Sequence, residues 1–189
     1  MKIVIIVHGW NGRPDAGWMK WINKELTNKG YKVIAQRMPN PDFPKIEPWV
    51  SKLKEIIGKV DKDLFFIGHS VGCQTILRYL ESLPDKSMIG GAVFVAGWLK
   101  LKNANTKEEV EISTPWLNTA INFEKVRSII NKSVYFLSDD DPWVSLENAE
   151  LFKNKLGCKV IIEKGHGHYM ENKIKEIPSV LKEFLELSR

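Results

Sequence analysis

The feature that most limits how this chain can fold is the stretch at residues 65–73, FFIGHSVGC. Its apolar beginning, residues 64–67, has the length and composition of a buried strand, and an amphipathic helical pattern follows at residues 74–83. Between them lies Gly-x-Ser-x-Gly, centred on Ser70. A strand, a tight turn and a helix in this order are typical of a nucleophile elbow, which exposes a serine hydroxyl at the tip of a strained turn.

The two glycines of this motif have a steric reason. Side chains at Gly68 and Gly72 would collide with the strand and the helix that cross beside the turn, and glycine removes the collision. The helix points its N-terminus, with free N–H groups and a positive dipole end, at the place where an oxyanion would form. The alternative is a Gly-rich turn with a solvated serine, but the flanking strand and helix favour a reactive Ser70.

Length and composition agree with one globular domain over residues 1–189. The net charge is +5, but the basic residues are scattered among acidic ones, so no nucleic-acid partner is expected. Cys73 and Cys158 form neither a disulfide framework nor a metal motif, which fits a reducing compartment. The sequence has no signal peptide and no apolar run of transmembrane length, so we expect a cytoplasmic protein with no membrane partner.

Short apolar strands alternate with helical patterns along the chain. Strands are expected at residues 3–7, 31–35, 64–67, 89–96, 133–137 and 159–163. Helices are expected at residues 15–29, 48–60, 74–83, 123–130 and 146–156, and from Pro178 onward. The alternation predicts an α/β fold with about six mainly parallel strands and helices on both faces. Residues 99–122 are polar and lack steady periodicity, so we interpret them as an insertion and leave open whether they form a lid.

Candidate catalytic side chains follow three of the expected strands. Ser70 ends the third strand, the aspartates at residues 139–141 follow the fifth, and His166 and His168 follow the sixth. Parallel strands bring their carboxyl ends, and the groups that follow them, to one edge of the sheet. A serine hydroxyl needs an imidazole to take its proton and a carboxylate to hold that imidazole. The sequence therefore predicts a Ser-His-Asp site at this edge.

At these residues the chain resembles the α/β-hydrolase superfamily and, more narrowly, its small serine hydrolases of the retinoblastoma-binding-protein-9 or YdeN-like type. The matching segments are His8-Gly9, residues 68–72, residues 138–144 (SDDDPWV) and residues 167–169 (GHY). The resemblance spans nearly the whole chain except for residues 99–122. It implies a compact α/β-hydrolase fold and a Ser-Asp-His hydrolase whose substrates are often undefined.

The resemblance also implies which aspartate and which histidine complete the catalytic triad with Ser70. The acid lies directly before the proline, at Asp141, and the histidine lies before an aromatic residue, at His168. A residue before proline is held extended, which agrees with this role, whereas the alternative for Asp141 is to cap the helix after Pro142. We expect the other two aspartates to be solvated. His166 remains the alternative base, and a metal site built from both histidines and the aspartates is a further alternative.

The surroundings of the serine can also be predicted. Backbone N–H groups that stabilise an oxyanion are expected from Val71 and from Trp10 or Asn11. Trp10, Trp98 and Trp143 each lie just past the carboxyl end of a strand. Together they predict an aromatic-lined cleft for an apolar acyl group.

The sequence as a whole predicts a serine hydrolase that cleaves an ester-type acyl bond of a small substrate through an acyl-enzyme. This chemistry needs no cofactor and no metal. The same machinery would serve a thioesterase or a peptidase. The family name also points to a protein partner. The non-enzymatic alternative is therefore a protein-binding module that keeps the triad without using it.

Overall fold

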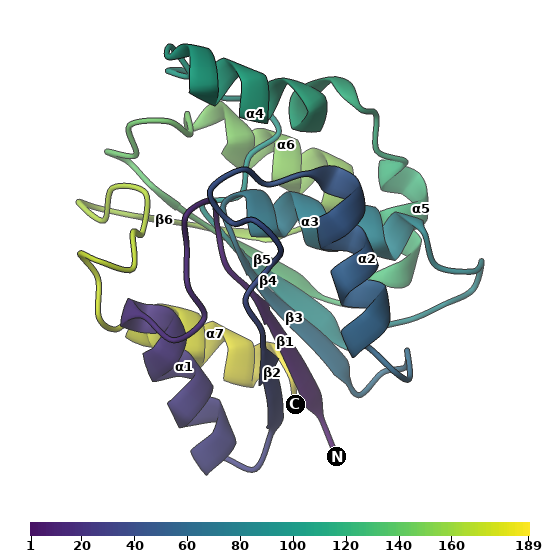
Figure 1. The fold of residues 1–189 in the computed structure, drawn as a ribbon. Coiled ribbons are helices and arrows are strands. Elements are labelled where there is room, and N and C mark those ends of the chain that lie inside the picture. Colours follow the sequence, from purple (N-terminus) through teal and green to yellow (C-terminus); the bar gives the residue numbers. More distant parts are fainter.

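The computed structural model describes all residues, 1–189, and contains a six-stranded sheet (Figure 1). The strands are β1 (Ile3–Val7), β2 (Lys32–Ala35), β3 (Leu64–His69), β4 (Gly91–Val95), β5 (Ser133–Ser138) and β6 (Lys159–Glu163). Every neighbouring pair is parallel, and the order across the sheet is β2-β1-β3-β4-β5-β6. All six expected strands are present, and the prediction of a mainly parallel sheet is confirmed.

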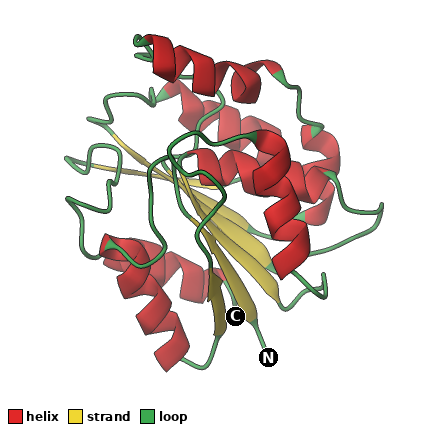
Figure 2. Ribbon diagram, viewed as in Figure 1, coloured by secondary structure: helices red, strands yellow, loops and turns green.

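Helices cover both faces of this sheet. They are α1 (Gly17–Asn28), α2 (Ile46–Ile56), α3 (Val71–Glu81), α4 (Lys107–Asn118), α5 (Phe123–Ile129), α6 (Glu147–Leu156) and α7 (Pro178–Leu187). Figures 1 and 2 show α1 and α7 on one face and α2, α3, α5 and α6 on the other. None of the helices is long and apolar enough to cross a membrane.

The inner strands β1 and β3 contribute side chains to two separate cores. Successive side chains of a strand point to opposite faces of the sheet. Ile5 and Val7 therefore join the core beneath α2 and α3, whereas Val4 and Ile6 join the core beneath α1 and α7. Because both faces are covered, these strands are apolar throughout instead of alternating with polar residues.

The segment at residues 99–122 is more ordered than its sequence pattern indicates. It contains α4, which its hydrophobic pattern does not predict, because only Ile112, Ser113 and Trp116 of this helix are buried. The helix begins with a capping box in which the Thr106 hydroxyl accepts the N–H of Glu109 and the Glu109 carboxylate accepts the N–H of Thr106. The spacing Thr-x-x-Glu was the signal for this helix start.

The packing of α3 against β1 gives a stability prediction. A Cβ atom on Gly72 would lie 2.5 Å from the carbonyl oxygens of Val7 and His8, which are backbone atoms of the β1 segment and cannot easily move. We expect Gly72→Ala to lower the free energy of unfolding by about 1–3 kcal/mol in chemical denaturation. The matched control is Gly58→Ala, because a Cβ atom there meets nothing within 4 Å. Equal stability of the two variants would contradict this packing argument.

Candidate active site

Ser70 lies in the sharp turn between β3 and α3. Its backbone is in a strained, positive-φ conformation (φ 51°, ψ −123°), and its N–H donates to the carbonyl oxygen of Val95 at 3.0 Å. A Cβ atom on Gly68 would lie 2.6 Å from Cδ1 of Ile76 in α3, while Gly72 touches the backbone of β1. Both glycines of the motif are thus required by the close approach of α3 to the sheet. The turn has the geometry expected of a nucleophile elbow.

The structure brings three predicted site residues into one chain of hydrogen bonds. The Ser70 hydroxyl lies 2.8 Å from Nε2 of His168, and Nδ1 of His168 lies 2.7 Å from Oδ2 of Asp141. The other carboxylate oxygen, Oδ1 of Asp141, accepts the N–H groups of Trp143 and Val144 at 2.9 Å each. Both interpretations of Asp141 therefore apply, since one oxygen caps the following turn and the other faces the imidazole.

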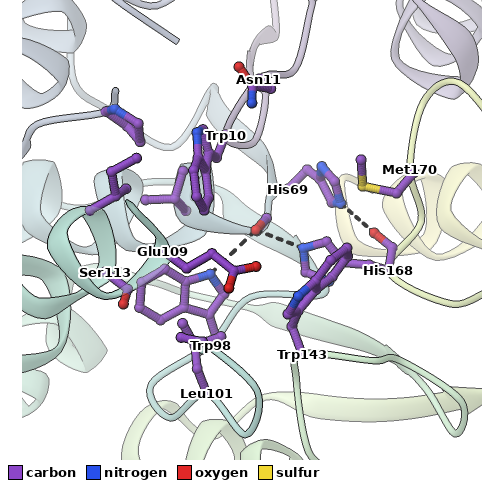
Figure 3. Close-up of a pocket in the computed structure, with 15 residues that line it drawn as sticks. Trp10, Asn11, His69, Trp98, Leu101, Glu109, Ser113, Trp143, His168 and Met170 are labelled. Carbon is purple, nitrogen blue, oxygen red and sulfur yellow. Dashed lines mark hydrogen bonds between the residues drawn. The ribbon is translucent and has the colours of Figure 1, made fainter. Parts of the chain in front are cut away.

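The hydrogen bonds define a direction for proton transfer. With Asp141 accepting from Nδ1, the neutral imidazole of His168 leaves Nε2 free to accept the serine O–H. Burial lowers the pKa of His168 and outweighs the hydrogen bond that the imidazole donates to Asp141, which by itself raises it. Trp98 adds a contact that the sequence did not indicate, because its indole N–H donates to Oγ of Ser70 at 3.3 Å (Figure 3). The serine oxygen thus accepts from Trp98 and donates to His168.

His166 lies apart from this chain of hydrogen bonds. Its ring stacks on Tyr169 with a centroid distance of 5.3 Å and an interplanar angle of 1°, and its side chain is 37% exposed. No group of three or more His, Cys, Asp or Glu side chains is arranged to hold a metal ion. The alternative metal interpretation of His166 and His168 therefore finds no ligand set.

The other two aspartates support the loop that carries His168. Both are exposed, as expected, but each also accepts a backbone N–H from that loop. Oδ1 of Asp139 accepts from Gly165 at 3.1 Å, and Oδ1 of Asp140 accepts from Gly167 at 2.7 Å. The hydrogen bond from Ser138 and that from Gly167 lower the pKa of Asp140. Sequence reasoning missed these contacts, because nothing in the sequence pairs an aspartate with a particular N–H of a distant loop.

The candidate oxyanion donors need one correction. The Asn11 N–H is already donated to the carbonyl oxygen of Pro41 at 2.7 Å, so it is not free to bind an oxyanion. The N–H groups of Trp10 and Val71 make no such backbone hydrogen bond. Val71 is the first residue of α3, where a helix leaves its N–H groups without partners. Of the two alternatives after β1, Trp10 therefore remains.

A cavity of about 250 Å³ opens onto Ser70 and His168. Trp10, Trp98 and Trp143 all line it, as predicted, and the Trp143 ring meets the His168 ring edge-on at 5.2 Å (Figure 3). One wall comes from the segment at residues 99–122. Its lining residues are Leu101, Ala104, Glu109, Ile112 and Ser113. The insertion thus helps to enclose the site.

Among known proteins, two relatives align with most of this chain. The chain is 24% identical over 171 residues to YdeN of Bacillus subtilis (strain 168), which is named as a hydrolase, covering 90% of this chain and 87% of that protein. It is 25% identical over 185 residues to serine hydrolase RBBP9 of Rattus norvegicus, covering 96% and 94%.

Solved structures share the fold. The crystal structure of the B. subtilis ydeN gene product superimposes with a TM-score of 0.89 at 23% identity, covering 99% of this chain and 98% of the other. A carboxylesterase structure from the ammonia-oxidizing thaumarchaeon Nitrososphaera gargenis gives a TM-score of 0.74 at 15% identity, covering 99% of this chain and 90% of the other. The sequence profile of the family described as "Serine hydrolase" matches residues 4–184. The chain therefore belongs to the serine hydrolase family.

Proposed function

We propose that the protein hydrolyses ester-type acyl bonds of small substrates, with Ser70 as nucleophile, His168 as general base and Asp141 as the group that orients His168. The observation that carries this proposal is the unbroken set of hydrogen bonds from Ser70 through His168 to Asp141, at 2.8 and 2.7 Å, beside an open cavity. A serine, a histidine and a carboxylate in this order form the machinery of acyl transfer.

In the first half of the reaction, Oγ of Ser70 attacks the substrate carbonyl carbon while Nε2 of His168 takes the hydroxyl proton. Negative charge moves to the carbonyl oxygen, where the free N–H groups of Val71 and Trp10 stabilise it; each such donor contributes about 3 kcal/mol to the transition state. The imidazolium then gives its proton to the leaving alcohol, and an acyl-enzyme on Ser70 remains. Asp141 holds the imidazole ring in the tautomer that this transfer needs.

In the second half, a water molecule attacks the acyl-enzyme, and His168 again acts as base and then as acid. The acid product leaves and the Ser70 hydroxyl is restored. The protein and water supply every group in this scheme, so it requires no cofactor.

The shape of the cavity supports a small, apolar acyl group as substrate. Its indole walls favour burial of apolar surface, at about 0.8 kcal/mol per methylene. The volume of about 250 Å³ lies just below the range of roughly 300–1,000 Å³ that is usual for pockets of drug-sized ligands. Because α4 closes one side, a long acyl chain finds little room.

The role of Ser70 can be tested with a fluorophosphonate probe, which labels an activated serine covalently. The wild-type protein is expected to label and to hydrolyse nitrophenyl esters. Ser70→Ala is expected to do neither while its circular dichroism and melting temperature stay unchanged, because the hydroxyl contributes little packing at the turn. Absence of labelling in the folded wild-type protein would instead favour a non-catalytic binding module.

The assignment of the base and the acid can be tested with matched pairs. His168→Ala and Asp141→Asn are each expected to lower kcat by at least about a hundredfold, since they remove general acid–base catalysis. The controls His166→Ala and Asp139→Asn change neighbouring residues of the same type and are expected to cost far less. If His166→Ala proves to be the inactive variant, the assignment of His168 is wrong although a serine mechanism remains.

The size of the acyl group can be tested by measuring kcat/KM over nitrophenyl esters of increasing chain length. Efficiency is expected to rise for the first few carbons, through apolar burial, and then to fall because the cavity is filled. A steady rise as far as palmitoyl would contradict the small-cavity argument. Uniformly negligible rates in a protein that labels with fluorophosphonate would move the proposal to thioester or peptide substrates.

A further inference from the structure

A second histidine–carboxylate pair lies directly behind His168, and the proposed mechanism does not use it. Oε1 of Glu171 is 3.5 Å from Nδ1 of His69, and the two side chains are 8% and 2% exposed. These two atoms are also among the three buried side-chain polar atoms of the protein that have no hydrogen-bond partner. The two atoms therefore face each other, but the geometry between them does not meet that of a hydrogen bond.

Electrostatics favours the charged form of this pair. A neutral imidazole and a neutral carboxyl group would both remain buried without compensation, whereas opposite charges attract strongly at this distance. Burial by itself lowers the pKa of His69 and raises that of Glu171. Burial is the largest single effect on each group, but the charge of the partner and the hydrogen bonds together outweigh it, so the pKa of His69 is raised and the pKa of Glu171 is lowered.

The other ionisable groups around His69 do not compete for this charge. His8 is held neutral, because burial lowers its pKa and its Nε2 accepts the N–H of Met38 at 2.9 Å. Asp141 faces His69 from beyond His168 and also favours the imidazolium. From α1, the ring of Trp18 meets His69 edge-on at 5.8 Å and contributes no charge.

The loop after β1 leaves room for both partners. A Cβ atom on Gly9 would lie 2.9 Å from Nδ1 of His69, and one on Gly12 would lie 2.8 Å from Oε1 of Glu171. Side chains at these two positions would therefore push the pair apart or cover it. The same loop carries Trp10, the candidate oxyanion donor, so the pair is enclosed by the segment that also completes the site.

The pair is linked to His168 through the backbone. Nε2 of His69 donates to the carbonyl oxygen of His168 at 2.7 Å (Figure 3). His168 lies between Gly167 and Tyr169, which have positive φ angles of 54° and 53°. A loop in this conformation depends on external contacts to keep its shape. His69 provides such a contact at His168, and Glu171 ties the same loop to His69 three residues later.

We propose that His69 and Glu171 are positioning residues for His168, with Glu171 holding His69 in its charged form. The charged His69 fixes the His168 backbone through its Nε2–H. Its ring lies 5.2 Å from the His168 ring, centroid to centroid, and its charge keeps that ring in the neutral form that accepts the Ser70 proton. The functional part of this inference rests on the proposed role of His168 as base. Burial, and then the charge of His69, lower the pKa of His168.

The charge of the pair can be measured without any activity. The chain has only four histidines, so ¹⁵N-edited NMR of the imidazole rings resolves each one. At neutral pH we expect both ring nitrogens of His69 to be protonated in the wild-type protein, and one of them to lose its proton in Glu171→Gln. The matched control is Glu176→Gln, which changes an exposed glutamate of the same segment and should leave His69 unchanged. A neutral His69 in the wild-type protein would overturn the proposal.

The effect on His168 can be measured by the pH dependence of kcat/KM for nitrophenyl acetate. In the wild-type enzyme the rate should fall as the pH drops through the pKa of His168, which burial lowers from its ordinary value. His69→Gln removes the neighbouring positive charge and leaves the Glu171 carboxylate, so it should move the acid limb upward by roughly one pH unit. Glu171→Gln removes both charges, whose effects on His168 oppose each other, so it should move the limb in the same direction by less, because the His69 charge has the larger effect. An unmoved limb in folded variants would overturn the proposal, since a merely structural pair would not shift it.

Two substitutions of His69 separate its hydrogen bond from its charge. Glutamine can still donate to the His168 carbonyl oxygen, whereas leucine cannot. His69→Leu should therefore lower kcat at the pH optimum by on the order of tenfold to a hundredfold, through misplacement of His168, and His69→Gln should retain most of it. Equal rates for the two variants would contradict the positioning role.

If the wild-type protein hydrolyses no ester, the proposed function fails while the NMR result still decides the charge of the pair.

Discussion

The close approach of β1, β3 and α3 around Ser70 is the constraint on which the rest of the site depends. Gly68 faces the side chain of Ile76 and Gly72 faces backbone carbonyl oxygens of the β1 segment, so neither position can hold a side chain without a shift. This packing forces Ser70 into a positive-φ turn and leaves the first N–H groups of α3 directed at the cavity. The strain at one residue is thus held by two packed strands and a helix.

The loop after β6 depends on contacts of a different kind. It contains three residues with positive φ, namely Gly165, Gly167 and Tyr169, and its backbone is held by hydrogen bonds from other segments. Acceptors on the loop after β5 bind its backbone N–H groups, while Trp18 donates to the carbonyl oxygen of Tyr169 at 2.8 Å. His69 at the end of β3 adds its hydrogen bond to the His168 carbonyl oxygen. These donors and acceptors come from α1, from β3 and from the end of β5 with the loop that follows it, so several elements at this edge of the sheet fix the position of His168.

Local patterns predicted the strands well and the insertion poorly. Each strand is a short apolar run that must be buried, so composition identifies it. In α4 only one narrow side faces the core, and the helix is stabilised by its capping box and by the buried Trp116, whose indole N–H donates to the carbonyl oxygen of Pro44 at 3.1 Å. Hydrophobic periodicity is weak where a helix covers a site instead of packing on a sheet. For this reason the sequence pattern did not predict α4.

The sequence by itself determined the order of elements, the elbow at Ser70 and the small set of aspartates and histidines from which the site is built. Those features depend on local chemistry, such as glycine at crowded positions and apolar residues in buried strands. Only the tertiary structure decided that the Asn11 N–H is already bonded, that Trp98 donates to Ser70 and that Glu171 faces His69. These are contacts between segments far apart in the chain, and their geometry follows from how the elements pack, which no local pattern records.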